Sequence, residues 1–382
     1  MAGLYIHIPF CASRCIYCSF YSTTSLQLSN QYVDTLCKEI DLRRKEVDTI
    51  QTIYLGGGTP SLLSPAHLQQ LFQKIKSSFS TASDMEVTIE CNPDDITTEF
   101  ADCLANLPIN RVSMGVQTFS NERLKFLRRR HTKEEVYKAV ERLRNAGITN
   151  ISIDLIFGFP SEQLADWEAD IDEALKLNIQ HISAYSLSYE EGTPLHRMRK
   201  SGIITDIDEE LSLQMYELLV KKLSENGFEH YEISNFAKTA TALDGTAISF
   251  RSKHNSSYWH SIPYLGIGAA AHSYDGETRK WNIADLKTYM NSISKGILPL
   301  EIETLDEPTR YNDCITTVLR TKEGINLEWF KKNFNYELYD YLLRESAPYI
   351  KANQLTIHNN HLALTAEGIF ISDMIMSDLI YV

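Results

Sequence analysis

Six short apolar runs, each followed by a segment of helical periodicity, fill the first half of the chain and restrict the folds open to it. The runs are LYIHIP (4–9), TIYLGGG (52–58), EVTIECNP (86–93), NRVSMGVQ (110–117), NISIDLIFGFP (150–160) and HISAYSL (181–187). The expected helical segments span 31–47, 64–79, 97–107, 121–146 and 163–178, and the one after the sixth run lies near 206–226. Repeated strand–helix units form parallel strands joined by right-handed crossovers. The sequence therefore predicts an α/β protein, with either an open sheet or a full or partial barrel.

Residues suited to chemistry stand where these strands end. They are Cys11–Cys18, Gly56–Pro60, Glu90–Pro93, Gln117, Asp154 and Gly158–Pro160. In open sheets and in barrels alike, the carboxyl ends of parallel strands carry the functional groups. We therefore expect these residues to share one site.

The pattern changes after about residue 200. A helix is expected near 206–226, and an aromatic stretch follows at 254–274. From about residue 300 we expect two helices, then a hairpin around HNN (358–360), then a final helix. This order favours a small winged-helix-like module. We predict three parts: a barrel at 1–230, a barrel extension at 231–300 and the C-terminal module at 301–382.

Charge and hydropathy exclude several classes of partner. The formal net charge is -13, and the C-terminal module has no concentrated basic helix, so broad binding to nucleic acid is not expected. No apolar run approaches 18 residues, which argues against a membrane span. The first residues lack the pattern of a secretory signal, so we expect a cytoplasmic location.

Three of the seven cysteines form the spacing C-x₃-C-x₂-C at Cys11, Cys15 and Cys18. Bunched cysteines in a chain without an export signal bind metal or perform redox chemistry more often than they form disulfides. A [4Fe–4S] cluster with three protein thiolates is favoured over a zinc site completed by Cys37 or His7. Reactive thiols without metal are a third alternative. His7 lies in a strand and is expected to pack or to support the loop.

A cluster with three thiolates leaves one iron for a small molecule, and an α-amino-carboxylate can chelate it. GGGTP (56–60) lets the backbone approach closely and is expected to offer free N–H groups, although glycines after a strand are often only a tight turn. Glu90 and Asp154 can accept hydrogen bonds from such a ligand. Each of these carboxylates can also be an ordinary cap or surface group.

At this point the residues resemble the radical S-adenosylmethionine (SAM) proteins, and most closely the oxygen-independent coproporphyrinogen oxidase group. The motifs YIHIPFC, YLGGGTPSLL, IECNPD, RVSMGVQTF, RRRHT and IDLIFGFP occur in that order. The resemblance covers essentially the whole chain. It implies a partial (β/α)6 barrel with a small C-terminal domain.

The chain resembles one branch of this group more than the other. The oxidases have C-x₃-C-x₂-C-x-C and an N-terminal arm, whereas here Phe20 stands two positions after Cys18 and ten residues precede Cys11. HNSSYW (254–259) is similar to the H-N-x-x-Y-W signature of the haem-chaperone (HemW) branch. The resemblance implies a protein that binds haem and transfers it to acceptor apoproteins, with respiratory cytochromes as candidates.

The resemblance also implies roles for individual positions. Cys11, Cys15 and Cys18 match the cluster ligands. The positions that match SAM contacts are Tyr5, Tyr17, Gly57, Gly58, Thr59, Glu90, Gln117, Arg129 and Asp154. In the oxidases some of these contact a second SAM, and the number bound here stays open. RRRH (128–131) can also be a solvated helix end.

The haem-binding residues implied by the signature are His254, Asn255, Tyr258 and Trp259. Histidine is a common haem ligand, and aromatic side chains pack well on a porphyrin face. The alternative is a packed aromatic corner in which His254 is a hydrogen-bonded core residue.

Two other functions remain open. One is radical SAM decarboxylation of coproporphyrinogen III, and the other is a radical SAM reaction on an unrelated substrate. The missing arm and Phe20 disfavour the oxidase, while HNSSYW favours haem.

Overall fold

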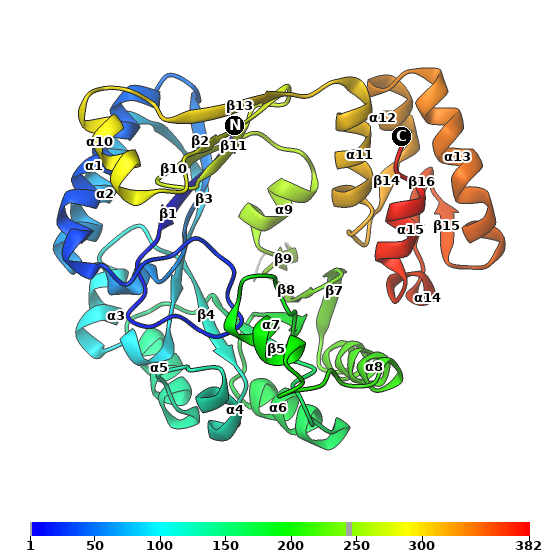
Figure 1. The fold of residues 1–382 in the computed structure, drawn as a ribbon, viewed down its shortest axis with the longest axis horizontal. Helices are drawn as coiled ribbons and strands as arrows, with labels where there is room; N and C mark the ends of the chain where they lie inside the picture. The colour runs from blue at the N-terminus through cyan, green and yellow to red at the C-terminus, as the bar shows by residue number, and fades with distance from the viewer. Residues whose placement is uncertain (1, 242–246) are drawn as a thin grey trace.

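The computed structural model describes residues 2–241 and 247–382. Its first half contains the six strand–helix units that the sequence predicts (Figure 1). The strands are β1 (Ala2–Ile8), β2 (Thr49–Gly57), β3 (Ser80–Cys91), β4 (Arg111–Gln117), β5 (Ile151–Phe157) and β6 (His181–Ser186). The helices are α1 (Ser29–Arg43), α2 (Pro65–Ser78), α3 (Thr98–Ala105), α4 (Asn121–Phe126), α5 (Lys133–Asn145) and α6 (Leu164–Lys176). Short 3₁₀ turns occur at Leu26–Leu28, Pro60–Leu62 and Pro93–Asp95.

The middle of the chain extends the sheet at both sides. Its elements are α7 (Pro194–Lys200), α8 (Glu209–Glu225), β7 (Phe228–Glu232), β8 (Asn235–Thr241), β9 (Ala247–Ser249), α9 (Lys253–Trp259), β10 (Tyr264–Ile267), β11 (His272–Tyr274), β12 (Thr278–Asn282), α10 (Leu286–Ser294) and β13 (Leu300–Thr304). Within the aromatic stretch 254–274, the structure has a helix and two strands that the sequence did not reveal.

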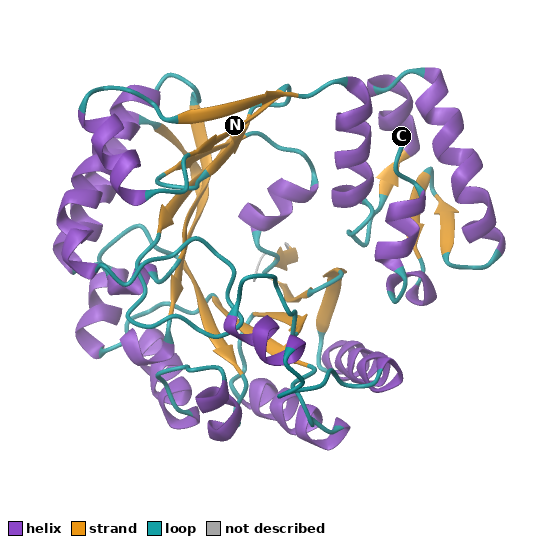
Figure 2. Cartoon of the chain, viewed as in Figure 1, coloured by secondary structure: helices purple, strands orange, loops and turns teal. Residues whose placement is uncertain are grey.

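The strands form one thirteen-stranded sheet in the order β13-β12-β11-β10-β1-β2-β3-β4-β5-β6-β8-β7, with β9 paired to β8. β1 to β6 are parallel, and β10 runs parallel to β1 on its other side. No pairing joins β13 to β7 among the described residues, so the sheet curves without closing. The outer face of this curve is covered by helices (Figure 2). The expectation of a partial barrel is thus confirmed.

The C-terminal module has its own core. It comprises α11 (Glu307–Val318), β14 (Ile325–Asn326), α12 (Leu327–Asn333), α13 (Tyr336–Lys351), β15 (Leu355–His358), β16 (His361–Leu364), α14 (Ala366–Ile369) and α15 (Ser372–Asp378). Tyr311, Phe330 and Leu342 are buried together there. The predicted hairpin is present, and its two turn residues, Asn359 and Asn360, have φ of 47° and 63°. Asparagine tolerates this left-handed conformation, which a two-residue hairpin requires.

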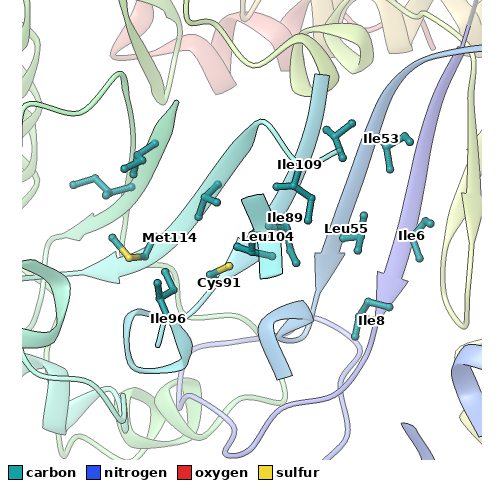
Figure 3. Packing of buried hydrophobic residues seen from close by; sticks show 14 of the residues in the cluster. Ile6, Ile8, Ile53, Leu55, Ile89, Cys91, Ile96, Leu104, Ile109 and Met114 are labelled. Atoms are coloured by element: carbon teal, nitrogen blue, oxygen red, sulfur yellow. The ribbon is translucent and has the colours of Figure 1, made fainter. Parts of the chain in front are cut away.

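The two faces of the parallel strands differ in polarity. Ile6 and Ile8 of β1, Leu55 of β2 and Ile89 of β3 are buried in the core between the sheet and the helices (Figure 3). Because neighbouring side chains of a strand point to opposite faces, the residues between them project to the inner face of the curve. These include Tyr5, His7, Glu90, Ser152 and Asp154. The alternation therefore directs polar groups into the barrel.

A buried ion pair joins α1 to the extension strands. Arg43 Nη1 donates to Glu39 Oε1 at 3.1 Å and to the carbonyl of Gly266 at 2.8 Å, and Nη2 donates to Ser273 Oγ at 3.0 Å. Glu39 also accepts hydrogen bonds from the Tyr289 hydroxyl, the Gly268 N–H and the Asn282 side-chain amide. Both charged side chains are fully buried. This network fixes the position of β10 and β11 against α1.

No described helix is both long enough and apolar enough to cross a membrane.

Candidate functional site

A cavity, here called the cluster cavity, lies at the carboxyl ends of the parallel strands. It is lined by residues from the loop after β1, the ends of β2 to β5 and the α4–α5 connection. Eleven of the twelve residues expected to hold the cluster or SAM line it: Cys11, Cys15, Tyr17, Cys18, Gly57, Gly58, Thr59, Glu90, Gln117, Arg129 and Asp154. Tyr5 is the exception. Further lining residues that the sequence did not single out include Ser113 and Gly115.

The loop that carries the three cysteines is held at several points. Cys11 N–H donates to the carbonyl of Thr23 at 2.9 Å, and Thr23 N–H donates to the carbonyl of Pro9 at 2.7 Å. Ile16 is buried in a small cluster with Leu127 and Phe159. These contacts fix the loop while Cys11, Cys15 and Cys18 remain half-buried at the cavity wall.

The cysteine thiols are set in surroundings that suit a cationic partner. Burial raises the pKa of Cys11 and of Cys18. Both groups are thiols at neutral pH unless a cation stabilises the thiolate, which metal coordination does. Thr59 Oγ1 lies 3.6 Å from Cys11 Sγ, and Arg129 Nη1 lies 3.5 Å from Cys15 Sγ. Hydrogen bonds of this kind to sulfur stabilise thiolates bound to iron.

The described residues contain no group of three His, Cys, Asp or Glu side chains arranged to hold one metal ion. A four-iron cube makes a different demand, because each thiolate binds a separate corner and the sulfurs need not converge on one point. Three separate thiols at one cavity wall are thus compatible with such a cluster. His7 is also unsuited as a fourth ligand, since its Nδ1 lies 3.0 Å from Tyr5 Oη and its Nε2 lies 3.0 Å from the carbonyl of Tyr21.

The glycine loop after β2 lies against the start of the cysteine loop. A Cβ on Gly58 would lie 2.8 Å from the carbonyl oxygen of Phe10, so only glycine fits there without displacing backbone. Gly57 has φ of 111°, a conformation that favours glycine. Its N–H donates to Glu90 Oε2 at 3.0 Å, and the Gly58 N–H donates to the carbonyl of Ile8 at 2.8 Å. These two N–H groups are therefore engaged within the protein, unlike the free donors that the sequence suggested.

Two half-buried carboxyl groups face the cluster cavity from β3 and β5. Tyr54 Oη donates to Glu90 Oε1 at 2.8 Å. Burial raises the pKa of Glu90 to about 7 and that of Asp154 to about 6. Both carboxyl groups therefore gain or lose a proton near neutral pH. The charged form accepts hydrogen bonds from a ligand, and the protonated form can also donate one.

We expect the Glu90 and Asp154 carboxyl groups to contribute a decline in the unfolding free energy of the chain without ligands as the pH rises from 5 to 8. Folding raises the pKa of such a carboxyl group above its value in the unfolded chain. Its contribution to the unfolding free energy is therefore complete below the unfolded pKa and is lost as the pH rises through the folded pKa. Glu90→Gln should flatten this decline, whereas the matched variant Glu141→Gln, at an exposed position on α5, should not. Urea unfolding at a series of pH values measures the effect. Parallel pH profiles for the wild type and Glu90→Gln would contradict it.

Arg129 projects into the cavity rather than into solvent. Its Nη2 donates to Asn92 Oδ1 at 2.7 Å and to the carbonyl of Gly115 at 2.6 Å, while its Nε has no partner among the described residues. The ordinary helix-end interpretation suits Arg130 instead, which pairs with Asp94 and Asp95 at 2.9 and 2.6 Å.

A second cavity, here called the aromatic cavity, lies on the inner side of β1 and β10–β12 and reaches α11. Its lining includes Tyr5, Phe20, Tyr258, Trp259, Tyr264, His272, Tyr274, Arg279, Arg310 and Asp313. Figure 1 shows α9 between the curved sheet and α11. Two of the four residues expected to bind haem, Tyr258 and Trp259, thus line this second cavity together with Tyr5.

The other two residues expected to bind haem, His254 and Asn255, do not line the aromatic cavity. His254 is 1% exposed, with Nδ1 2.8 Å from Thr52 Oγ1 and Nε2 2.8 Å from Tyr258 Oη. Burial lowers the pKa of His254 to about 3, so the ring is neutral. Asn255 stands in the first turn of α9, where its N–H donates to Ser252 Oγ at 3.3 Å. As it stands, His254 offers no free ring nitrogen to a ligand.

Three residues of the aromatic cavity, His272, Arg279 and Arg310, were not predicted from the sequence. They come from two short strands and a helix of the C-terminal module, and only the fold brings them together. Alternation along β11 places His272 and Tyr274, which are two residues apart, on the same face of the strand. A strand of three residues is too short for that signal to be recognised.

Comparison with known proteins agrees with this geometry. The model of the radical SAM superfamily matches residues 5–174, and that of the HemN C-terminal domain matches 305–371. The heme chaperone HemW of Lactococcus lactis is 36% identical over 86% of this chain and 84% of its own length, and that of Bacillus subtilis is 35% identical over 88% of each. The solved coproporphyrinogen III oxidase HemN of Escherichia coli superposes with a TM-score of 0.84 at 22% identity, covering 99% of this chain and 90% of that one. At that identity the likeness shows the fold alone.

Proposed function

Because this chain belongs to the HemW family of radical SAM proteins, we propose that it binds haem and transfers it to acceptor proteins. We propose further that Cys11, Cys15 and Cys18 hold a [4Fe–4S] cluster and that SAM binds exchangeably at the open corner. The strongest support is the gathering of eleven residues that the strand ends and the family resemblance predicted around one cavity at the ends of the parallel strands.

The residues of the cluster cavity have distinct tasks under this proposal. Cys11, Cys15 and Cys18 would hold the cluster, which would supply, when reduced by an external donor, an electron for radical chemistry on SAM. Thr59 and Arg129 donate to cysteine sulfur and favour the thiolate form. Glu90 holds the glycine loop through the Gly57 N–H, while Asp154 and Gln117 face the space left for the nucleoside. The unpartnered Arg129 Nε is suited to an acceptor group on the ligand.

The alternative is the oxidative decarboxylation of coproporphyrinogen III. It is favoured by the fold shared with the solved oxidase along nearly the whole chain. It is disfavoured by Phe20, because this position carries a cysteine in the oxidase motif that the sequence otherwise resembles.

An anaerobic experiment on the reconstituted protein separates the two functions. We expect hemin to bind with about one equivalent per chain and to move to an added apo-cytochrome, and we expect no carbon dioxide from coproporphyrinogen III in the presence of SAM and a reductant. Repeated turnover to protoporphyrinogen would establish the oxidase instead. Absence of hemin binding by the fully reconstituted chain would remove the chaperone proposal.

The proposal also covers the cellular compartment, the haem acceptors and the division of the chain into domains. All seven cysteines are free thiols, which supports a reducing compartment such as the cytoplasm. Respiratory cytochromes are the proposed acceptors. We retain as a proposal the division into a barrel (1–230), its extension (231–300) and the C-terminal module (301–382); the separate cores of the barrel and of the module support its last boundary.

A further inference from the structure

The aromatic cavity has a volume of about 800 Å³, which lies in the range of cofactor-binding pockets. Its walls are largely tyrosine, phenylalanine and tryptophan side chains from β1, the cysteine loop, α9 and β10–β11. Aromatic rings favour flat, apolar ligands, because they offer broad contact surfaces. The cavity is therefore suited to the face of a planar macrocycle.

Two arginines line the α11 side of this cavity, and they differ in their ion pairing. Arg279 is paired with Asp313 and lies 3.5 Å from Glu303, whereas the Arg310 guanidinium has no ion-pair partner among the described residues. Two buried donors of the lining, Arg310 Nε and Trp259 Nε1, lack hydrogen-bond partners there. In a chain of formal net charge -13, an unpaired arginine at an apolar cavity points to an anionic ligand group.

His272 supplies a metal-binding group at the same cavity. It is exposed, and no hydrogen bond to its ring is present among the described residues. Its ring stacks on Trp281 of the neighbouring strand with centroids 5.7 Å apart. This stacking orients the imidazole and leaves its nitrogens free. His254, by contrast, has both nitrogens engaged.

We propose that the aromatic cavity is the haem site of this chain, with His272 as an iron ligand and Arg310 as the partner of a propionate. The inference rests on the proposed haem-binding function and identifies where the haem lies. In this arrangement the HNSSYW segment contributes cavity wall through Tyr258 and Trp259, and His254 holds Tyr258 in place through the 2.8 Å contact to its hydroxyl.

Hemin titration of the full-length protein, followed by its Soret band, tests the iron ligand. His272→Ala should shift the band and weaken binding by about tenfold or more, because an axial ligand is lost. Added imidazole should restore the wild-type spectrum in His272→Gly. The matched control is His260→Ala, an exposed histidine just after α9 whose Nδ1 lies 2.8 Å from the carbonyl of Ser256.

The propionate contact is tested with a neutral probe. Arg310→Gln should weaken binding of hemin about tenfold while leaving hemin dimethyl ester unaffected, since the ester carries no carboxylates. Arg344→Gln removes the same charge from an exposed position on α13 and should change neither affinity.

The outcomes separate the site from the function. If wild type binds hemin and His272→Ala has the wild-type spectrum, the site inference is overturned while the haem function stands. Loss of the signal in His254→Ala with full retention in His272→Ala would assign the ligand to His254. If wild type binds no hemin, the proposed function itself fails.

Discussion

Cys15→Ser is expected to reduce iron and acid-labile sulfide in the reconstituted protein from about four of each per chain to background. Cys15 is the central cysteine of the loop, and its sulfur is the one that Arg129 contacts at 3.5 Å. Serine keeps the size of the side chain but is a far weaker iron ligand. With two cysteines left, two of the four irons would lack a protein ligand instead of one, and the cube would be exposed to solvent at both.

The matched control for this prediction is Cys37→Ser, which changes another half-buried cysteine on α1 in the same way. It should retain the full iron and sulfide content and the broad absorbance of the cluster. Retention of a complete cluster by Cys15→Ser would contradict the ligand assignment. A zinc content of one per chain in the wild type, with no sulfide, would contradict the cluster itself.

Arg43→Met is expected to lower the free energy of unfolding by about 3–5 kcal/mol, because it leaves the Glu39 carboxylate buried without its cation. The Arg43 side chain is fully buried and also donates to the carbonyl of Gly266 and to Ser273 Oγ. Its loss therefore breaks the connection between α1 and the strands beside β1. Urea unfolding followed by far-ultraviolet circular dichroism measures the change.

Arg44→Met is the matched control, since the neighbouring arginine is exposed and its replacement removes the same charge. Its unfolding free energy should stay within about 0.5 kcal/mol of wild type. The double variant Glu39→Gln/Arg43→Met should be more stable than Arg43→Met alone, because the unpaired charge is gone. Equal stability of Arg43→Met and Arg44→Met would show that the buried pair contributes little.

The part of the fold that could be predicted is the part in which strands and helices alternate along the chain. β1 to β6 and their helices are long enough for the two periodicities to be read, and the carboxyl ends of parallel strands always meet at one edge. β10 to β13 have between three and five residues each, and β10 contains a glycine, so no period could be recognised. Their positions depend on tertiary pairing with β1 and on the Glu39–Arg43 network.

Of the two cavities, one could be predicted from the sequence and the other could not. The cluster cavity could be predicted because its residues follow successive strands and match a known order of motifs. The motif HNSSYW, in contrast, marked a segment without showing which of its side chains face a cavity. His254 lies on the buried side of α9, and the free imidazole at the aromatic cavity comes from β11, eighteen residues later in the chain. Burial and hydrogen-bond partners decide this, and neither can be read from a motif.

The place of β1 has a consequence for how the chain matures on the ribosome. β1 carries the cysteine loop, yet one of its edges is covered only when residues 264–267 have been made and paired with it. Until then the nascent polypeptide has an open strand edge next to Cys11, Cys15 and Cys18, the proposed cluster ligands, and late closure of such long-range pairings is slow. The cysteine loop is therefore synthesised more than 240 residues before the strand that completes the pairing of β1.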